Sequence, residues 1–149
     1  LFNRRAMQQM LDDYQAQSLP LAVIALDSDH FKTINDHFGH DVGDAVIVSL
    51  ATLMQQDLRA DAALCRSGGE EFLLLLPGVS GVQAERIAER LRLRVESHEM
   101  GQAGRITISL GVAHWPGDAS DLGAVLKQAD KALYQAKHRG RNCVVVAGA

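Results

Sequence analysis

Apolar residues recur along the chain with two different spacings, and these spacings predict helices separated by strands. Apolar positions three and four residues apart, which are typical of helices, lie within residues 7–14, 42–54, 84–95 and 122–133. Strand-like apolar runs lie at residues 21–26, 62–66, 72–76, 105–112 and 143–147. The runs at 21–26 and 72–76 are apolar at every position, which is typical of strands buried on both faces of a sheet.

The order of these elements indicates the fold class. Helices and strands follow one another without a linker, and we expect one domain over residues 1–149. The pattern predicts an α/β fold, more closely an α+β sandwich, in which helices pack on a mixed sheet. Gly68 and Gly69 are expected to join two of the strands in a tight antiparallel turn. Nucleotide sites in such folds lie at strand ends and helix N-termini.

Composition and charge narrow the classes of partner. The net charge of −3 gives no support for binding to nucleic acid or to an anionic membrane. No apolar run approaches the ~20 residues that span a bilayer, and no signal peptide opens the chain, so we expect a cytoplasmic domain without direct membrane insertion. Cys65 and Cys143 lie in apolar runs and are expected to be buried thiols. The first residue is not Met, and we expect a piece of a longer regulated protein.

Carboxylates stand where two of the predicted strands end. Asp27 and Asp29 follow the run at 21–26, while Glu70 and Glu71 lie at the hairpin turn. If the two strands are neighbours, Asp27, Glu70 and Glu71 converge and need a counter-charge. A divalent cation with oxygen ligands is the usual solution, and it suits phosphoryl or nucleotidyl transfer. Taken singly, each acid is also typical of a solvated turn or helix start.

Basic residues supply a possible complement to these acids. Lys32 follows the first strand, and Lys137 and Arg141 flank the end of the last helix. Cations at a helix C-terminus offset the helix dipole, which is one interpretation of this pattern. The other is a clamp on a triphosphate, in which arginine offers a bidentate fork and lysine a point charge.

Four segments carry a resemblance to a known family. "DSDHFKTINDHFGHDVGD", "RSGGEEF", "TISLGVA" and "ADKALYQAKHRGRN" follow one another in the order of the four signature blocks of the GGDEF domain, the diguanylate cyclase family, here with a GGEEF signature. The resemblance covers essentially the whole chain. It implies a five-stranded mixed sheet surrounded by helices, similar to the palm of nucleotidyl cyclases. It also implies condensation of two GTP molecules into cyclic di-GMP with release of two pyrophosphates, by a homodimer of antiparallel domains.

The resemblance assigns the acids to a Mg²⁺ or Mn²⁺ site. Asp27 and Glu70 match metal ligands of the family, with the carbonyl of Ser28 as a third ligand. Glu71 matches a second-metal or catalytic carboxylate. All three carboxylates are therefore expected to take part in catalysis.

The resemblance also assigns the substrate contacts. Asn35 and Asp44 match a pair that recognises guanine. Gly68 and Gly69 are expected to let the base lie against the turn without a Cβ in its way, although a simple hairpin requirement also explains glycine there. The phosphate contacts implied are Lys32, Lys137 and Arg141, helped by backbone N–H groups from His30 through Phe31 to Lys32.

The chain departs from the family at an inhibitory product site. The family often carries R-x-x-D upstream of the signature, and the corresponding segment here is "RADA". Arg59 is present, but Ala62 takes the place of the aspartate. Asp61 is one residue out of register, which in an extended segment turns its side chain to the opposite face. We expect weak or absent product inhibition through this degenerate site.

Two other functions stay open beside an active cyclase. One is a catalytically silent GGDEF domain that binds GTP or relays a signal. The other is an enzyme that makes a mixed cyclic dinucleotide. The retained acids favour activity, and the retained Asn35 and Asp44 favour guanine. The resemblance leaves open a sensor or a membrane anchor in a region that precedes Leu1.

Overall fold

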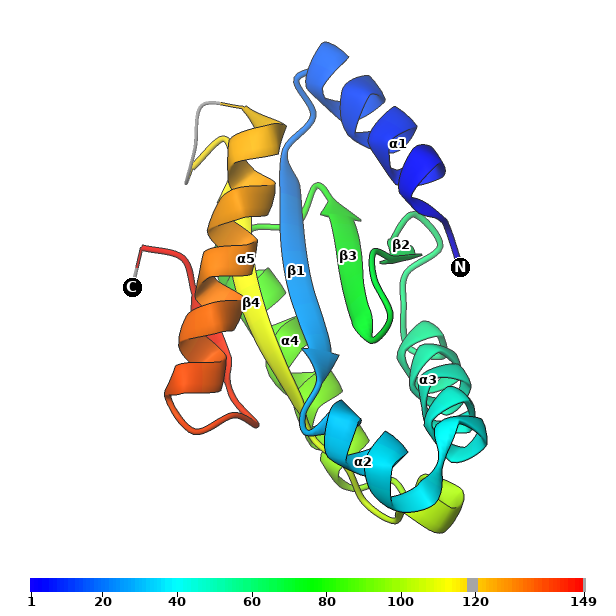
Figure 1. The fold of residues 1–149 in the computed structure, drawn as a ribbon. Helices are drawn as coiled ribbons and strands as arrows, with labels where there is room; N and C mark the ends of the chain where they lie inside the picture. Colours follow the sequence, from blue (N-terminus) through cyan, green and yellow to red (C-terminus); the bar gives the residue numbers. More distant parts are fainter. Residues whose placement is uncertain (118–120, 149) are drawn as a thin grey trace.

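The fold is a mixed β-sheet with helices on both faces (Figure 1). A computed structural model describes residues 1–117 and 121–148. Within these ranges the sheet has five strands in the order β2-β3-β1-β4-β5. The strands are β1 Leu21–Ser28, β2 Ala63–Arg66, β3 Glu71–Pro77, β4 Ile108–Trp115 and β5 Val144–Val146. The five-stranded mixed sheet and the flanking helices confirm the fold class expected from the sequence.

Strand β1 is the centre of the sheet and pairs antiparallel with both β3 and β4. The edge strands differ, because β2 runs antiparallel to β3 while β5 runs parallel to β4. Successive side chains of a strand point to opposite faces. On β1, Ala22, Ile24 and Leu26 therefore belong to one core cluster, and the residues that alternate with them belong to another.

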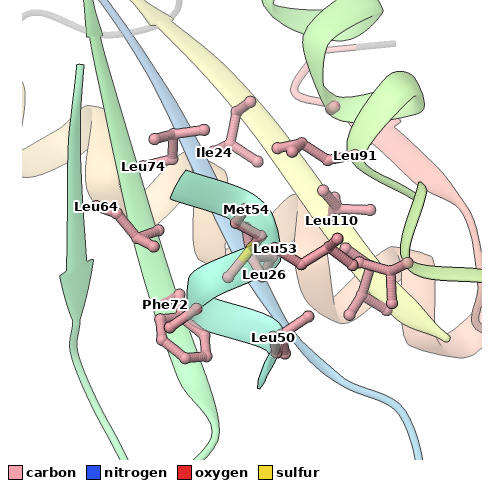
Figure 2. Packing of buried hydrophobic residues seen from close by; sticks show 14 of the residues in the cluster. Ile24, Leu26, Leu50, Leu53, Met54, Leu64, Phe72, Leu74, Leu91 and Leu110 are labelled. Carbon is pink, nitrogen blue, oxygen red and sulfur yellow. The ribbon is translucent and has the colours of Figure 1, made fainter. Parts of the chain in front are cut away.

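Each face of the sheet is covered by its own helices. The helices are α1 Arg4–Ala16, α2 Phe31–Phe38, α3 His40–Gln55, α4 Gly81–Glu96 and α5 Leu122–His138, with a short 3-10 helix, η1, at Gly101–Ala103. Residues of α3 and α4 pack on the face that carries Ile24 and Leu26 (Figure 2). Helices α1 and α5 cover the other face (Figure 1). No helix in the described ranges is long and apolar enough to cross a membrane.

Local sequence signals set where several helices begin. The Asn3 side chain accepts a hydrogen bond from the backbone N–H of Ala6 at the start of α1. Ser80 and Gln83 form a capping box at the start of α4. Asp121 accepts from the backbone N–H of Ala124 at the start of α5. These caps satisfy backbone groups that have no partner within the helix.

The fourth strand lies three residues later than the sequence pattern predicted. It begins at Ile108 and ends at Trp115, so the prediction of a strand at 105–112 was wrong at both ends. The alternation was misleading at its start because Gly104 has φ +70° and Arg105 forms only an isolated bridge with Glu99. Trp115 is a buried strand residue paired with Leu21.

A glycine of β4 allows α5 to approach the sheet closely. A Cβ on Gly111 would lie 2.2 Å from the backbone nitrogen of Leu133 and 2.3 Å from the carbonyl oxygen of Ala129. Only glycine fits at this contact without displacement of the helix. The C-terminal half of α5 lies to the side of the end of β1 (Figure 1), and its Lys137 reaches Asp27 there, at the candidate site.

Candidate active site

The residues expected to carry chemistry gather at one end of the sheet. The C-terminal end of β1, the β2–β3 loop, the start of α2 and the end of α5 all lie at this end (Figure 1). Asp27 of β1 is the direct cross-strand partner of Glu71 of β3. Side chains of directly opposed residues lie on the same face of a sheet. The two strands are therefore neighbours, as the sequence argument required.

Asp27 is the most buried of these acids. Its side chain is 6% exposed and accepts a hydrogen bond through Oδ2 from the Nζ of Lys137. Its other oxygen, Oδ1, is buried and has no hydrogen-bond partner among the described residues. Burial raises the pKa of Asp27, and Lys137 acts in the opposite direction. The first counter-charge at this site is therefore a lysine that we had expected to contact phosphate.

Glu71 and Asp130 form a second acidic pair beside Asp27. Burial raises the pKa of Glu71, and the nearby carboxylates of Asp130 and Asp27 raise it further. Burial also raises the pKa of Asp130, which lies on α5 and shares a side-chain hydrogen bond with Glu71. Glu70 is half-buried, and its charge raises the pKa of Asp27. Sequence reasoning missed Asp130, although it stands seven residues before Lys137, two helical turns away on the same side of α5.

An arginine holds the loop that carries the two glycines. The Arg66 guanidinium donates to the carbonyl oxygens of Gly68 and Gly69, at 3.2 Å and 2.5 Å from Nε and Nη2 respectively. The loop consists of residues 67–70 and joins β2 to β3, which pair antiparallel as we expected. Neither glycine has a positive φ, and a Cβ would meet nothing closer than 3.6 Å at Gly68 and nothing within 4 Å at Gly69. The hairpin itself therefore does not require glycine here.

Asn35 and Asp44 come from two adjacent helices. Asp44 is exposed on α3, whereas the Oδ1 atom of Asn35 is buried without a hydrogen-bond partner among the described residues. A Cβ on Gly43 would lie only 1.7 Å from that atom. Gly43 thus creates the space in which the Asn35 carboxamide lies. Sequence reasoning missed this glycine, which an isolated glycine inside a helical pattern could have signalled.

Two of the three expected phosphate contacts share one cavity. Lys137 and Arg141 line an open cavity of about 520 Å³ together with Tyr134, His138 and Gly140. Lys32 lies apart from them, exposed on α2 and without an ion pair among the described residues.

The start of α2 presents backbone donors near this end of the sheet. His30 precedes the helix in the left-handed conformation, with φ +58°. The N–H groups of Phe31 and Lys32 belong to the first turn and have no acceptor within the helix. Phe31 is half-buried and packs against the core.

The donor set at this edge fits a hard divalent cation in part. Within the part of the chain that the structure describes, a buried carboxylate oxygen of Asp27 has no hydrogen-bond partner, and Glu70 and Glu71 lie near this carboxylate. Magnesium is commonly held by one or two carboxylates together with substrate phosphates. Within the described ranges, however, no group of three or more His, Cys, Asp or Glu side chains is arranged to hold a metal ion. The protein alone therefore offers an incomplete ligand set, which the substrate would have to complete.

Arg59 lies on another part of the surface. It lines a cavity of about 310 Å³ with Arg86 and Arg90 of α4. Its guanidinium binds both carboxylate oxygens of Asp61, at 3.0 and 2.8 Å. We placed Asp61 on the opposite face on the assumption of an extended segment, whereas residues 60 and 61 form a turn.

Comparison with known proteins gives a consistent result over nearly the whole chain. The family profile described as "Diguanylate cyclase, GGDEF domain" matches residues 1–143. The response regulator PleD of Caulobacter vibrioides is 42% identical over 154 residues, which cover 97% of this chain and 34% of PleD. The diguanylate cyclase DgcM of Escherichia coli K12 is 39% identical over 99% of this chain and 37% of its own length. The chain thus spans about a third of the length of these relatives.

Solved structures agree with the sequence comparison. The active GGEEF domain of a diguanylate cyclase from Vibrio cholerae superposes with a TM-score of 0.91, at 34% identity, over 100% of this chain and 99% of that domain. The GGDEF domain of DgcB from Caulobacter crescentus, solved in complex with c-di-GMP, gives a TM-score of 0.90 at 31% identity, over 99% of this chain and 91% of that one. Together with the family profile, these matches show that the chain belongs to the GGDEF domain family of diguanylate cyclases.

Proposed function

We propose that this domain is a diguanylate cyclase, which condenses two GTP molecules into cyclic di-GMP and two pyrophosphates. One observation carries the proposal. At the end of β1, the buried Asp27 lies opposite Glu71 on the adjacent strand and beside Lys137, and its Oδ1 has no hydrogen-bond partner among the described residues. Unpaired buried carboxylate oxygens are costly unless a ligand satisfies them.

Asp27, Glu70 and the Ser28 carbonyl are proposed to hold a divalent cation, Mg²⁺ or Mn²⁺, with Glu71 as a second-metal or catalytic carboxylate. Members of the family use divalent metal ions, and carboxylate and carbonyl oxygens are the ligands that these ions prefer. When bound, the cation neutralises charge on the phosphates and lowers the pKa of the attacking hydroxyl.

The remaining residues bind and orient the nucleotide. Asn35 and Asp44 are proposed to recognise guanine, since a buried acceptor that pairs with guanine donors would be left unpaired by adenine. Lys137 and Arg141 line one cavity and supply the cations for the triphosphate, with Lys32 and the first turn of α2 as further donors. Nothing lies where a Cβ would stand on Gly69, which leaves room for the base against the loop.

The reaction requires two copies of the domain. Each copy holds one GTP, and its 3′-hydroxyl oxygen forms a bond to the α-phosphorus of the GTP on the partner. The bond from that phosphorus to the bridging β-phosphate oxygen breaks, and pyrophosphate leaves. The hydroxyl proton passes to a base in the site, for which Glu71 is our candidate. The same step on the second nucleotide closes the ring.

Product analysis tests the proposal directly. The purified chain is incubated with GTP and Mg²⁺ or Mn²⁺, and nucleotides and pyrophosphate are resolved by chromatography. We expect cyclic di-GMP, two pyrophosphates per product, and a rate per chain that rises with chain concentration at saturating GTP. Excess chelator and Asp27→Asn should each abolish the product. GTP binding without any product would identify a catalytically silent domain instead, and a rate per chain that stays constant over a hundredfold dilution without dimer would refute the two-copy mechanism.

A further inference from the structure

The loop between α5 and β5 has an unusual backbone. Three consecutive residues have positive φ: Gly140 at +113°, Arg141 at +66° and Asn142 at +47°. Glycine adopts such values freely and asparagine tolerates them, but arginine does so at a steric cost. A non-glycine residue stays in this region only where its surroundings determine the conformation strongly. Arg141 is one of the two cations that line the candidate phosphate cavity.

Asn142 is the residue that fixes this loop to the rest of the domain. Its Oδ1 accepts a hydrogen bond of 3.0 Å from Nη1 of Arg92, fifty residues away in sequence. Its Nδ2 donates to Oε2 of Glu96 at 2.5 Å. Both partners lie on α4, and Glu89 holds the Arg92 guanidinium through two further bonds. The side chain of Asn142 therefore connects the loop to a helix on the opposite face of the sheet.

The backbone of Asn142 is held by a different element. Its N–H donates to Oδ2 of Asp29 at 3.0 Å. Asp29 is 4% exposed, and it also accepts from Thr107 Oγ1 at 2.7 Å and Ser109 Oγ at 2.6 Å. It follows Asp27 by two residues. This acid, which the sequence singled out beside Asp27, therefore ties the end of β1 to the loop that carries Arg141.

We propose that Asn142 is a positioning residue for Arg141. It holds the loop in the left-handed conformation that places the Arg141 guanidinium in the cavity shared with Lys137, and so sets the affinity for the polyphosphate of the substrate. The proposal rests on the proposed function in that Arg141 binds phosphate. Asn142 itself need not touch the substrate, because its side chain is committed to Arg92 and Glu96.

Binding of inorganic pyrophosphate and of a non-hydrolysable GTP analogue, by calorimetry in the presence of Mg²⁺, tests this role. Asn142→Ala keeps the N–H to Asp29 but loses the side-chain bonds and strains a positive φ. We expect it to weaken binding of both probes about tenfold, comparable to the loss of one charge-assisted contact. Asn142→Gly also loses the side-chain bonds but adopts the positive φ without strain, and its loss should be smaller. Glu85→Gln, on the exposed side of α4, is the matched control and should bind as the parent does.

A double-variant cycle separates positioning from general stabilisation. In an Arg141→Ala background, Asn142→Ala should weaken pyrophosphate binding less than twofold further, because residues that act through one another are not additive. A full tenfold loss in that background, or unchanged binding in Asn142→Ala, overturns the proposal.

A second variant covers the case in which Asn142→Ala does not fold. Arg92→Gln removes one of the two bonds between Asn142 and α4 and leaves the bond to Glu96. It should weaken binding by part of the tenfold loss, again only when Arg141 is present. If Asn142→Ala is unfolded, and Arg92→Gln is folded and binds both probes as the parent does, the proposal is overturned. Absence of cyclic di-GMP among the reaction products would refute the proposed function alone, because the tests of Asn142 measure binding of the probes and do not depend on catalysis. A parent chain that binds neither probe overturns both.

Discussion

Gly43 offers a test in which stability and activity should change independently. A Cβ built on Gly43 lies 1.7 Å from Oδ1 and 2.9 Å from Cγ of Asn35, and 3.4 Å from Cζ of Phe31. The contact with Phe31 is ordinary, so Gly43→Ala conflicts only with the end of a flexible side chain. The Asn35 carboxamide must rotate away from its present position. That position is the one from which we propose that it recognises guanine.

The two effects of Gly43→Ala can be estimated separately. Alanine is favoured over glycine inside a helix by about 1 kcal/mol, and a forced off-rotamer side chain costs about 0.5–1.5 kcal/mol. These terms nearly cancel, and with about 2–4 °C per kcal/mol for a domain of this size the melting temperature should change by no more than about 4 °C. Loss of a buried hydrogen bond to guanine costs about 1–3 kcal/mol, which lowers kcat/KM for GTP about 5- to 150-fold.

The assay pairs thermal unfolding with GTP binding and cyclase kinetics. Gly81→Ala is the control, because a Cβ there meets only Cβ of His114 at 3.8 Å. Gly43→Ala should have no further effect on kcat/KM in an Asn35→Ala background. A Gly43→Ala variant with the GTP affinity of the parent would refute the reasoning. So would a loss of activity that is matched by a large fall in melting temperature.

Three further predictions follow from the packing and the charges of the site. Lys137→Met leaves the buried Asp27 without its cation, and because the lysine is 36% exposed we expect a loss of only about 1–2 kcal/mol at pH 7. The pKa of Asp27 is raised in the folded protein, so its protonated form adds stability at low pH, and this stability is lost as pH rises through that pKa. The loss of stability in Lys137→Met, measured by urea unfolding of the metal-free protein, should therefore shrink towards pH 4. A loss that is constant with pH contradicts this. Gly111→Ala places a Cβ 2.2 Å from the backbone of Leu133 and should destabilise the fold by about 1–3 kcal/mol in the same assay, whereas an unchanged unfolding midpoint would refute the close contact. Cyclic di-GMP should inhibit only weakly, since Arg59 is already paired with Asp61, and sub-micromolar product binding that is lost in Arg59→Ala would show otherwise.

Sequence periodicity predicted the central part of the fold correctly and failed at its margins for local reasons. The apolar runs at 21–26 and 72–76 lie in β1 and β3, because a strand buried on both faces has an unambiguous pattern. The fourth strand was misplaced because "RITISLGV" alternates from its first residue, although the backbone at Gly104 interrupts the extended conformation. Alternating apolar and polar residues indicate which side chains can face a core. The residue at which a strand begins depends on its pairing with the neighbouring strand.

The limits at the site have a different physical origin. Carboxylates at strand ends could be located from the sequence, since Asp27 and Glu71 adjoin long apolar runs. Their partners could not, because Lys137 reaches Asp27 from 110 residues away and its position depends on the close approach of α5 at Gly111. The same applies to Asn142, whose bonds to Arg92 and Asp29 join α4, β1 and the last loop. Periodicity and motifs identify residues that act through their own chemistry. Residues that act by holding others become visible only when the chain is folded, as the bonds of Asn142 beside the left-handed Arg141 illustrate.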